Sequence, residues 1–126
     1  MLIPKGHQAV MPYLMLEDAV KFFDFTTAVF DAEVTHRMLH ENGMLQHGEI
    51  RIGGSTIMFA NSRDEWKPAT ANMFIYVDDA DAVFAKAMAN GGETIMEPAD
   101  QVYGRSCGVK DPFGNVWWIT SPPNVE

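Results

Sequence analysis

The sequence has little of three things: cysteine, positive charge and long apolar runs. One of its 126 residues is cysteine, Cys107, which excludes an intrachain disulfide and a cysteine-based zinc site. Nine Lys+Arg against 17 Asp+Glu give a formal net charge of −8, which argues against a nucleic acid or an anionic membrane as partner. No apolar stretch approaches the roughly 18 residues of a membrane span. The first residues also lack the order of a signal peptide, so we expect a cytoplasmic protein.

What the sequence does contain is one order of elements that occurs twice. Leu16 corresponds to Val77 and Phe23 to Phe84, in both cases 61 positions later. In the first half, apolar periodicity and turn residues predict a strand over 9–16, a helix that starts at Glu17-Asp18, and strands over 33–40, 45–52 and 56–60. In the second half they predict a strand over 72–77, a helix that starts at Asp78-Asp79, and strands over 93–97, 102–110 and 116–120.

This repeat predicts an α+β fold of two βαβββ modules with mixed, mostly antiparallel sheets. We expect one domain over 1–126, with modules over about 7–61 and 70–122 and a polar connector over 62–69. One helix covers only one face of a four-stranded sheet. The other face must meet a second sheet, a ligand or a partner chain, which points to a binding cleft.

Several motifs carry a resemblance to a known family over roughly residues 9–121. They are Met11-Pro12-Tyr13-Leu14, His47-Gly48-Glu49-Ile50-Arg51-Ile52-Gly53, Tyr103-Gly104-Arg105 and the segment from Asp111-Pro112-Phe113-Gly114-Asn115 to Ile119. With the double βαβββ repeat, they resemble the vicinal oxygen chelate superfamily of glyoxalases, bleomycin-resistance proteins and dioxygenases, and its PhnB-like branch in particular. The fold hosts lyases, isomerases, dioxygenases, transferases and non-catalytic drug binders, so the resemblance leaves the activity open.

The resemblance implies a divalent metal held by four side chains, one from the first and one from the last strand of each half. The corresponding positions here are Met11, Met58, Asn72 and Trp118. A thioether is a weak ligand for such metals and an indole is none. We therefore predict no metal and no other cofactor, with a divalent metal on substitute ligands kept as the alternative.

His47 and Glu49 are the candidate catalytic residues. They lie two apart in a predicted strand, so both side chains point to the same face, while Gly48, Ile50 and Ile52 take the opposite face, under the helix. Either the two form a solvated strand face with a cross-strand pair, or Glu49 acts as a general base with His47 beside it. Cys107 has no histidine in register, so we expect an inert thiol.

An apolar, aromatic cleft is the other candidate site. Strand parity and the resemblance together suggest ligand-binding positions at Met11, Tyr13, Met58, Asn72, Phe74, Tyr76 and Trp118. The resemblance also suggests that Arg105 anchors an anionic group or positions a loop. The acidic balance favours a cationic ligand.

Three functions stay open on this basis. The first is a non-catalytic small-molecule binder that lacks the usual metal site. The alternative is a metal-dependent or Glu49-based lyase or dioxygenase of the same superfamily, so whether the chain is an enzyme is undecided. The third is an interaction module with a closed cleft. The resemblance further implies a homodimer, which fits two open sheet faces that are too apolar to be left wet.

Overall fold

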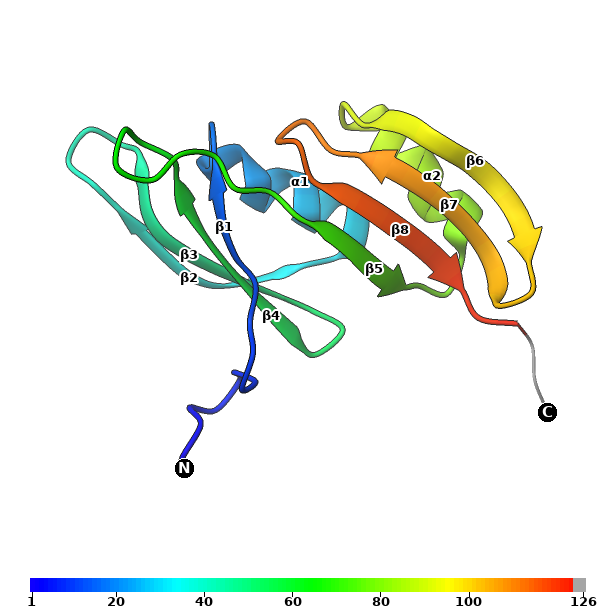
Figure 1. The fold of residues 1–126 in the computed structure, drawn as a ribbon, viewed down its shortest axis with the longest axis horizontal. Coiled ribbons are helices and arrows are strands. Elements are labelled where there is room, and N and C mark those ends of the chain that lie inside the picture. The colour runs from blue at the N-terminus through cyan, green and yellow to red at the C-terminus, as the bar shows by residue number, and fades with distance from the viewer. Residues whose placement is uncertain (124–126) are drawn as a thin grey trace. The chain divides into compact units, whose positions relative to one another are not determined.

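The chain forms two compact units, each built from one four-stranded sheet and one helix (Figure 1). The structure is a computed structural model and describes residues 1–123. The first unit comprises Met1–Thr70 and the second begins at Ala71. The order strand–helix–strand–strand–strand occurs in each unit, which confirms the predicted α+β fold of two βαβββ modules.

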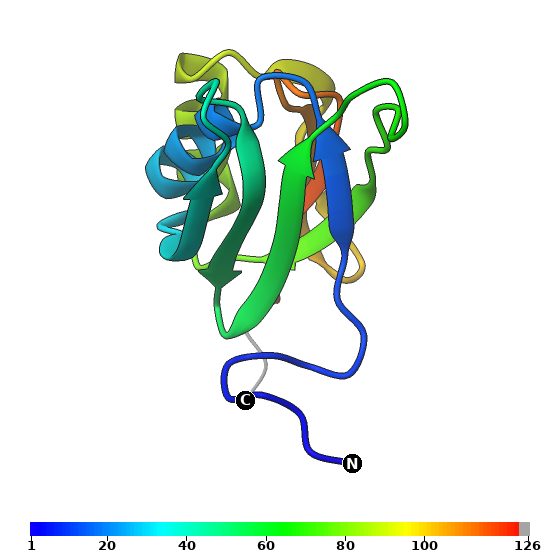
Figure 2. The same ribbon diagram turned by 90° about the vertical axis from the view of Figure 1, so that its left-hand side faces the viewer.

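In the first unit, the strand that opens the repeat lies next to the strand that closes it. The elements are β1 (Tyr13–Leu16), α1 (Val20–Phe30), β2 (Glu33–Leu39), β3 (Leu45–Ile52) and β4 (Ser55–Asn61). Their order in the sheet is β1-β4-β3-β2, which can be followed in Figure 2. β1 runs parallel to β4 and the other neighbours are antiparallel, so the sheet is mixed as expected.

The core of the first unit lies between α1 and one face of this sheet. Phe22 and Phe23 of α1 are fully or nearly fully buried, and both rings lie 4.8 Å from the ring of Phe59 on β4. Gly48 on β3 leaves room for this contact, because a Cβ there would lie 2.7 Å from Cζ of Phe23. Ile50 is fully buried on the same face, as the alternation along β3 predicted.

The starts of several elements differ from the sequence-based prediction, and the strand predicted from residue 102, for example, begins at Gly104. The first strand begins at Tyr13 rather than at residue 9, because Pro12 has no N–H to give to a ladder. The first helix begins after its acidic pair: Asp18 has a positive φ of 51°, and Ala19 takes the cap position without a side-chain hydrogen bond. No helix within residues 1–123 is long and apolar enough to cross a membrane.

The second unit repeats the arrangement. Its elements are β5 (Asn72–Tyr76), α2 (Ala80–Ala89), β6 (Glu93–Gln101), β7 (Gly104–Lys110) and β8 (Val116–Ser121). Their order is β5-β8-β7-β6, and β5 runs parallel to β8. Asp79 caps α2, since its carboxylate accepts a hydrogen bond from Ala82 N. β6 extends past the predicted end at Glu97, with irregular pairing to β7.

The buried face of this second sheet carries Val109, Trp117 and Ile119, each at most 2% exposed. Trp117 faces this core, whereas its neighbour Trp118 lies on the opposite face and is partly exposed, as their alternation predicted. Each sheet therefore has one face covered by its helix and one open face.

Candidate functional site

The open face of the first sheet carries a group of polar and apolar side chains from three strands. Tyr13 of β1 and Glu49 of β3 are both in register with Met58 of β4, which lies between them. His47 lies two residues before Glu49 on the same face of β3. The sequence predicted this placement for all four residues, and the structure brings them together.

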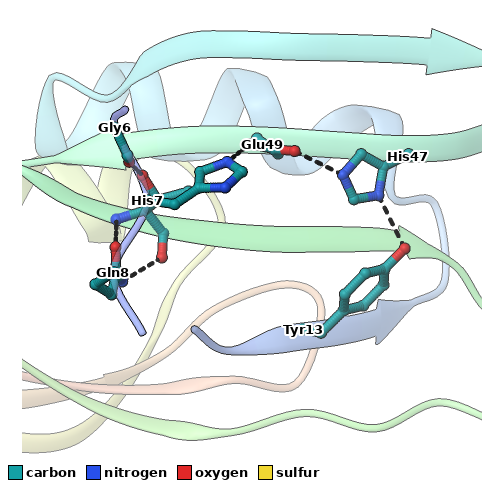
Figure 3. Close-up of polar contacts among 7 residues, drawn as sticks. Gly6, His7, Gln8, Tyr13, His47 and Glu49 are labelled. Carbon is teal, nitrogen blue, oxygen red and sulfur yellow. Dashed lines mark hydrogen bonds and ion pairs between the residues drawn. The ribbon is translucent and has the colours of Figure 1, made fainter. Parts of the chain in front are cut away.

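Hydrogen bonds join these side chains into one chain across the sheet (Figure 3). Tyr13 Oη lies 2.9 Å from His47 Nδ1, and His47 Nε2 lies 2.8 Å from Glu49 Oε2. The other carboxylate oxygen, Oε1, lies 2.7 Å from Nε2 of His7. We call Tyr13, His47, Glu49 and His7 the polar chain. An ordered series of this kind can pass a proton as well as hold a ligand.

Burial and hydrogen bonding act in opposite directions on Glu49. Its side chain is 13% exposed, and this burial alone raises the pKa of the carboxyl group. The hydrogen bonds from His47 and then His7 outweigh it, so the pKa of Glu49 lies below its ordinary value. The pKa of Tyr13 is raised, first by burial and then by the charge of Glu49. Glu49 is thus held as a carboxylate and Tyr13 as a neutral phenol near neutral pH.

The segment before β1 is held against this face by side-chain contacts (Figure 3). Gln8 makes two hydrogen bonds with the backbone of Thr56. Its Nε2 donates to the carbonyl oxygen of Thr56 at 2.9 Å, and its Oε1 accepts from the amide of Thr56 at 3.3 Å. The hydroxyl of Thr56 donates to the carbonyl of Gly6. These contacts place His7 beside Glu49.

The sequence did not single out His7 or His36, although both belong to this site. His36 of β2 is in register with Glu49, and its ring lies 5.3 Å from that of His47. The turn at Asn42-Gly43 contains a signal for His36, because pairing the two strands symmetrically about that turn sets 36 opposite 49. His7 lies 42 residues from Glu49 and carries no such local signal.

The open face of the second sheet is aromatic. Phe74, Tyr76 and Tyr103 are each at least half exposed, and the ring of Phe74 lies 5.2 Å from Tyr76 and 6.3 Å from Tyr103. We call these three residues the aromatic cluster. Trp118 is in register with Phe74 on this face and lies across Gly108, where a Cβ would meet the indole at 2.5 Å.

Three other residues discussed from sequence lie apart from these groups. Arg105 forms a bidentate ion pair with Asp81 of α2 and so belongs to the helix side of its sheet. Met11 precedes β1 and is half-buried. Cys107 is fully buried, and burial is the main cause that raises the pKa of its thiol to about 11, as an inert cysteine requires.

The residues at the superfamily's metal positions do not fit a divalent metal. Met11 and Met58 offer thioethers and Trp118 an indole. Asn72 has the single oxygen ligand of the set, and that Oδ1 accepts a hydrogen bond from Nε1 of Trp118 at 3.2 Å. Within residues 1–123, no group of three or more His, Cys, Asp or Glu side chains is arranged to hold a metal ion.

Comparison with known proteins identifies the family. A model of the Glyoxalase/Bleomycin resistance protein/Dioxygenase superfamily matches residues 7–119. The chain belongs to this superfamily. The match confirms the resemblance seen in the sequence motifs, and membership in this superfamily accounts for the duplicated βαβββ module.

Proteins similar to this chain are known from sequence and from structure. The uncharacterized protein Mb0911c of Mycobacterium bovis is 31% identical over 126 residues, covering 90% of this chain and 83% of that protein. TnmS3, an antibiotic binding protein from Streptomyces sp. CB03234, superposes with a TM-score of 0.71 at 19% identity, covering 93% of this chain and 100% of that chain. TioX from Micromonospora sp. ML1 superposes with a TM-score of 0.72 at 20% identity, covering 94% and 99%. At these identities the two structures show the fold alone.

Replacing Glu49 with glutamine tests the electrostatic part of the polar chain. A neutral amide loses the charge-assisted bonds to His7 and His47, so we expect the free energy of unfolding at neutral pH to fall by about 1–2 kcal/mol. Because the pKa of Glu49 is lowered in the folded state from its ordinary value of 4.5, its contribution to stability is present above that value and is lost as the pH falls through the folded value. Urea titrations at several pH values measure this, and a difference that stays constant down to acid pH contradicts it.

Proposed function

We propose that this superfamily member binds a small, planar aromatic molecule by stacking and apolar contact rather than through a metal. The observation that carries the proposal is the aromatic cluster. Phe74 is 52% exposed, Tyr76 66% and Tyr103 51%, and the rings of Tyr76 on β5 and of Tyr103 in the turn after β6 both lie beside the ring of Phe74. Exposed rings gathered in this way are typical of a binding surface.

Two further features support binding without metal chemistry. The metal positions of the superfamily hold side chains that ligate poorly, and the one oxygen ligand among them, on Asn72, is engaged by Trp118. The fold is shared with TnmS3, which is an antibiotic binding protein. The net charge of −8 favours a cationic ligand over an anionic one.

A second candidate function is an enzyme of the lyase or dioxygenase type that works through Glu49 and His47. Its support is the hydrogen bond of 2.8 Å between the two side chains, with Tyr13 at the other ring nitrogen. Quantitative metal analysis of the purified protein discriminates the metal-dependent form of this candidate from the binder, because a stoichiometric divalent metal contradicts metal-free binding.

We also propose a cytoplasmic homodimer, since a cluster of exposed rings is costly to leave in water.

Replacing Phe74 with alanine tests the binder directly. Ligands are first found by thermal shift against a panel of cationic and neutral planar aromatic compounds, because a compound that binds the folded state raises the melting temperature. For a compound so found, we expect the Phe74→Ala variant to bind about tenfold more weakly, since it loses one stacking ring.

The matched control is Val102→Ala. Val102 is also an exposed apolar residue of the second unit, at 100% exposure, and lies outside the aromatic cluster. Its replacement is expected to leave the affinity unchanged. Equal affinity of the wild type and the Phe74→Ala variant, or a panel in which no compound shifts the melting temperature, contradicts the proposed function.

A further inference from the structure

Tyr13 joins the polar chain to a hollow on the first unit. The hollow has a volume of about 450 Å³ and is lined by Tyr13, by apolar Met15, Leu45 and Ala60, and by Arg63 and Trp66 of the connector. A neighbouring hollow of about 510 Å³ includes no member of the polar chain. A molecule bound in the Tyr13 hollow would therefore meet the polar chain at Tyr13.

The direction of each hydrogen bond in the chain follows from Glu49. A carboxylate only accepts, so His47 and His7 must both donate to it from Nε2. A neutral His47 then has a free lone pair on Nδ1, and Tyr13 donates its phenolic hydrogen to that nitrogen. Among residues 1–123 the hydroxyl of Tyr13 has no other hydrogen-bond partner, so its oxygen can accept from a ligand in the hollow.

We propose that Tyr13, backed by His47 and Glu49, is a proton-accepting site for a hydroxylated aromatic ligand. The ligand O–H bond breaks and its proton moves to Tyr13 Oη, while the original Tyr13 proton moves to His47 Nδ1. His47 becomes an imidazolium that Glu49 stabilises through the existing bond of 2.8 Å. The ligand is left as a bound phenolate, so one proton has moved along the chain and no other reactant is needed.

The connector supplies surfaces that suit such a ligand. The guanidinium of Arg63 lies 4.7 Å from the ring centroid of Trp66, which is 54% exposed, so the two form a flat, cationic wall. Arg63 also pairs with Glu65 at 2.9 Å, but both side chains are about half exposed and such a pair is weak. A phenolate oxygen can therefore compete for Arg63.

Charged and titratable side chains from the neighbouring segments lie around the polar chain. His7 reaches it from the segment before β1, His36 from β2 and Arg51 from β3, where Arg51 follows Glu49 by two residues. His7 donates to the second oxygen of Glu49 and so helps to keep the carboxylate ionised. This leaves His47 as the group that takes the proton.

The probe that tests the site is 4-nitrophenol, whose phenol and phenolate forms absorb at different wavelengths. At a pH below the probe's own pKa, we expect it to bind the wild-type protein as phenolate, with the ratio of phenolate to phenol raised about tenfold. In the Tyr13→Phe and His47→Gln variants we expect binding without this increase. Binding as the neutral phenol, no detectable binding at millimolar concentration, or full ionisation in the His47→Gln variant overturns the proposal.

Asp24→Asn is the control, because Asp24 is an exposed residue of α1 in the same unit and belongs neither to the lining of the hollow nor to the polar chain. Ionisation of the bound probe should be unchanged in this variant, and a loss equal to that of His47→Gln contradicts the assignment. A second measurement needs no variant and no ligand. Long-range ¹⁵N–¹H NMR correlations identify the tautomer of neutral His47, for which we expect the proton on Nε2, and a proton on Nδ1 overturns the proposal.

Discussion

Replacing Asp111 with alanine is expected to lower the free energy of unfolding by about 4 kcal/mol. The Asp111 side chain is 3% exposed and accepts four hydrogen bonds at 2.8–2.9 Å. The donors are Nε1 of Trp117, Nδ2 of Asn115 and the backbone amides of Phe113 and Asn115. Alanine removes the acceptor of all four bonds, and losing the acceptor of a buried donor costs about 1–3 kcal/mol before relaxation. Urea unfolding measures the change.

Two further variants show whether the loss comes from these bonds. Asp111→Asn keeps one acceptor oxygen and the shape of the side chain, so its stability should lie between the wild type and the alanine variant. Asp100→Ala removes an acid whose side chain is 88% exposed, and we expect a change within about 0.5 kcal/mol. A loss in Asp111→Ala no larger than in Asp100→Ala contradicts the role assigned to Asp111.

Replacing Gly48 with valine is expected to destabilise the first unit by about 3 kcal/mol. A Cβ at this position would lie 2.7 Å from Cζ of Phe23 and 3.0 Å from both Leu45 and Phe59. These neighbours are buried rings and a buried leucine, so there is little space into which they can move. Thermal and urea unfolding measure the loss.

The control for Gly48 is valine at the exposed Gln46 of the same strand. It introduces the same β-branched side chain without a core contact, and the expected change is within about 0.5 kcal/mol. Gly48 lies between His47 and Glu49, so the overpacked strand should also disturb the polar chain on the opposite face. If the Gly48→Val and Gln46→Val variants have the same stability, close packing of α1 against β3 is not the reason why position 48 requires glycine.

The segment Asp111–Asn115 shows how a family motif can be structural rather than catalytic. In the sequence, this segment is one of the motifs that carry the resemblance to the superfamily. In the structure Asp111 organises the turn and also holds the indole of Trp117, six residues later, in the core. The motif therefore positions β8, and with it the open-face residue Trp118, without taking part in the site itself.

Local pattern was sufficient for the order of the elements and for the faces of His47, Glu49, Trp117 and Trp118. Along β3 the alternation correctly assigned Gly48 and Ile50 to the helix side and His47 and Glu49 to the open side, because successive side chains of a strand point in opposite directions. The same rule separated Trp117 from Trp118. The limits of the first strand and the first helix were less predictable, since they depend on Pro12 and on the positive φ of Asp18.

Contacts between distant segments were decided only by the tertiary structure. Nothing near His7 indicates that it binds Glu49, because that bond depends on how the segment before β1 docks on Thr56. The pairing of Arg105 with Asp81 likewise depends on where α2 crosses its sheet. Periodicity in the sequence describes one strand or helix at a time. A series of hydrogen bonds across a sheet depends instead on the register of several strands and on the path of the polypeptide segment that covers them. The sequence thus establishes the duplicated βαβββ fold and the candidates His47 and Glu49. Only the tertiary structure joins these two residues with Tyr13 and His7 in the polar chain.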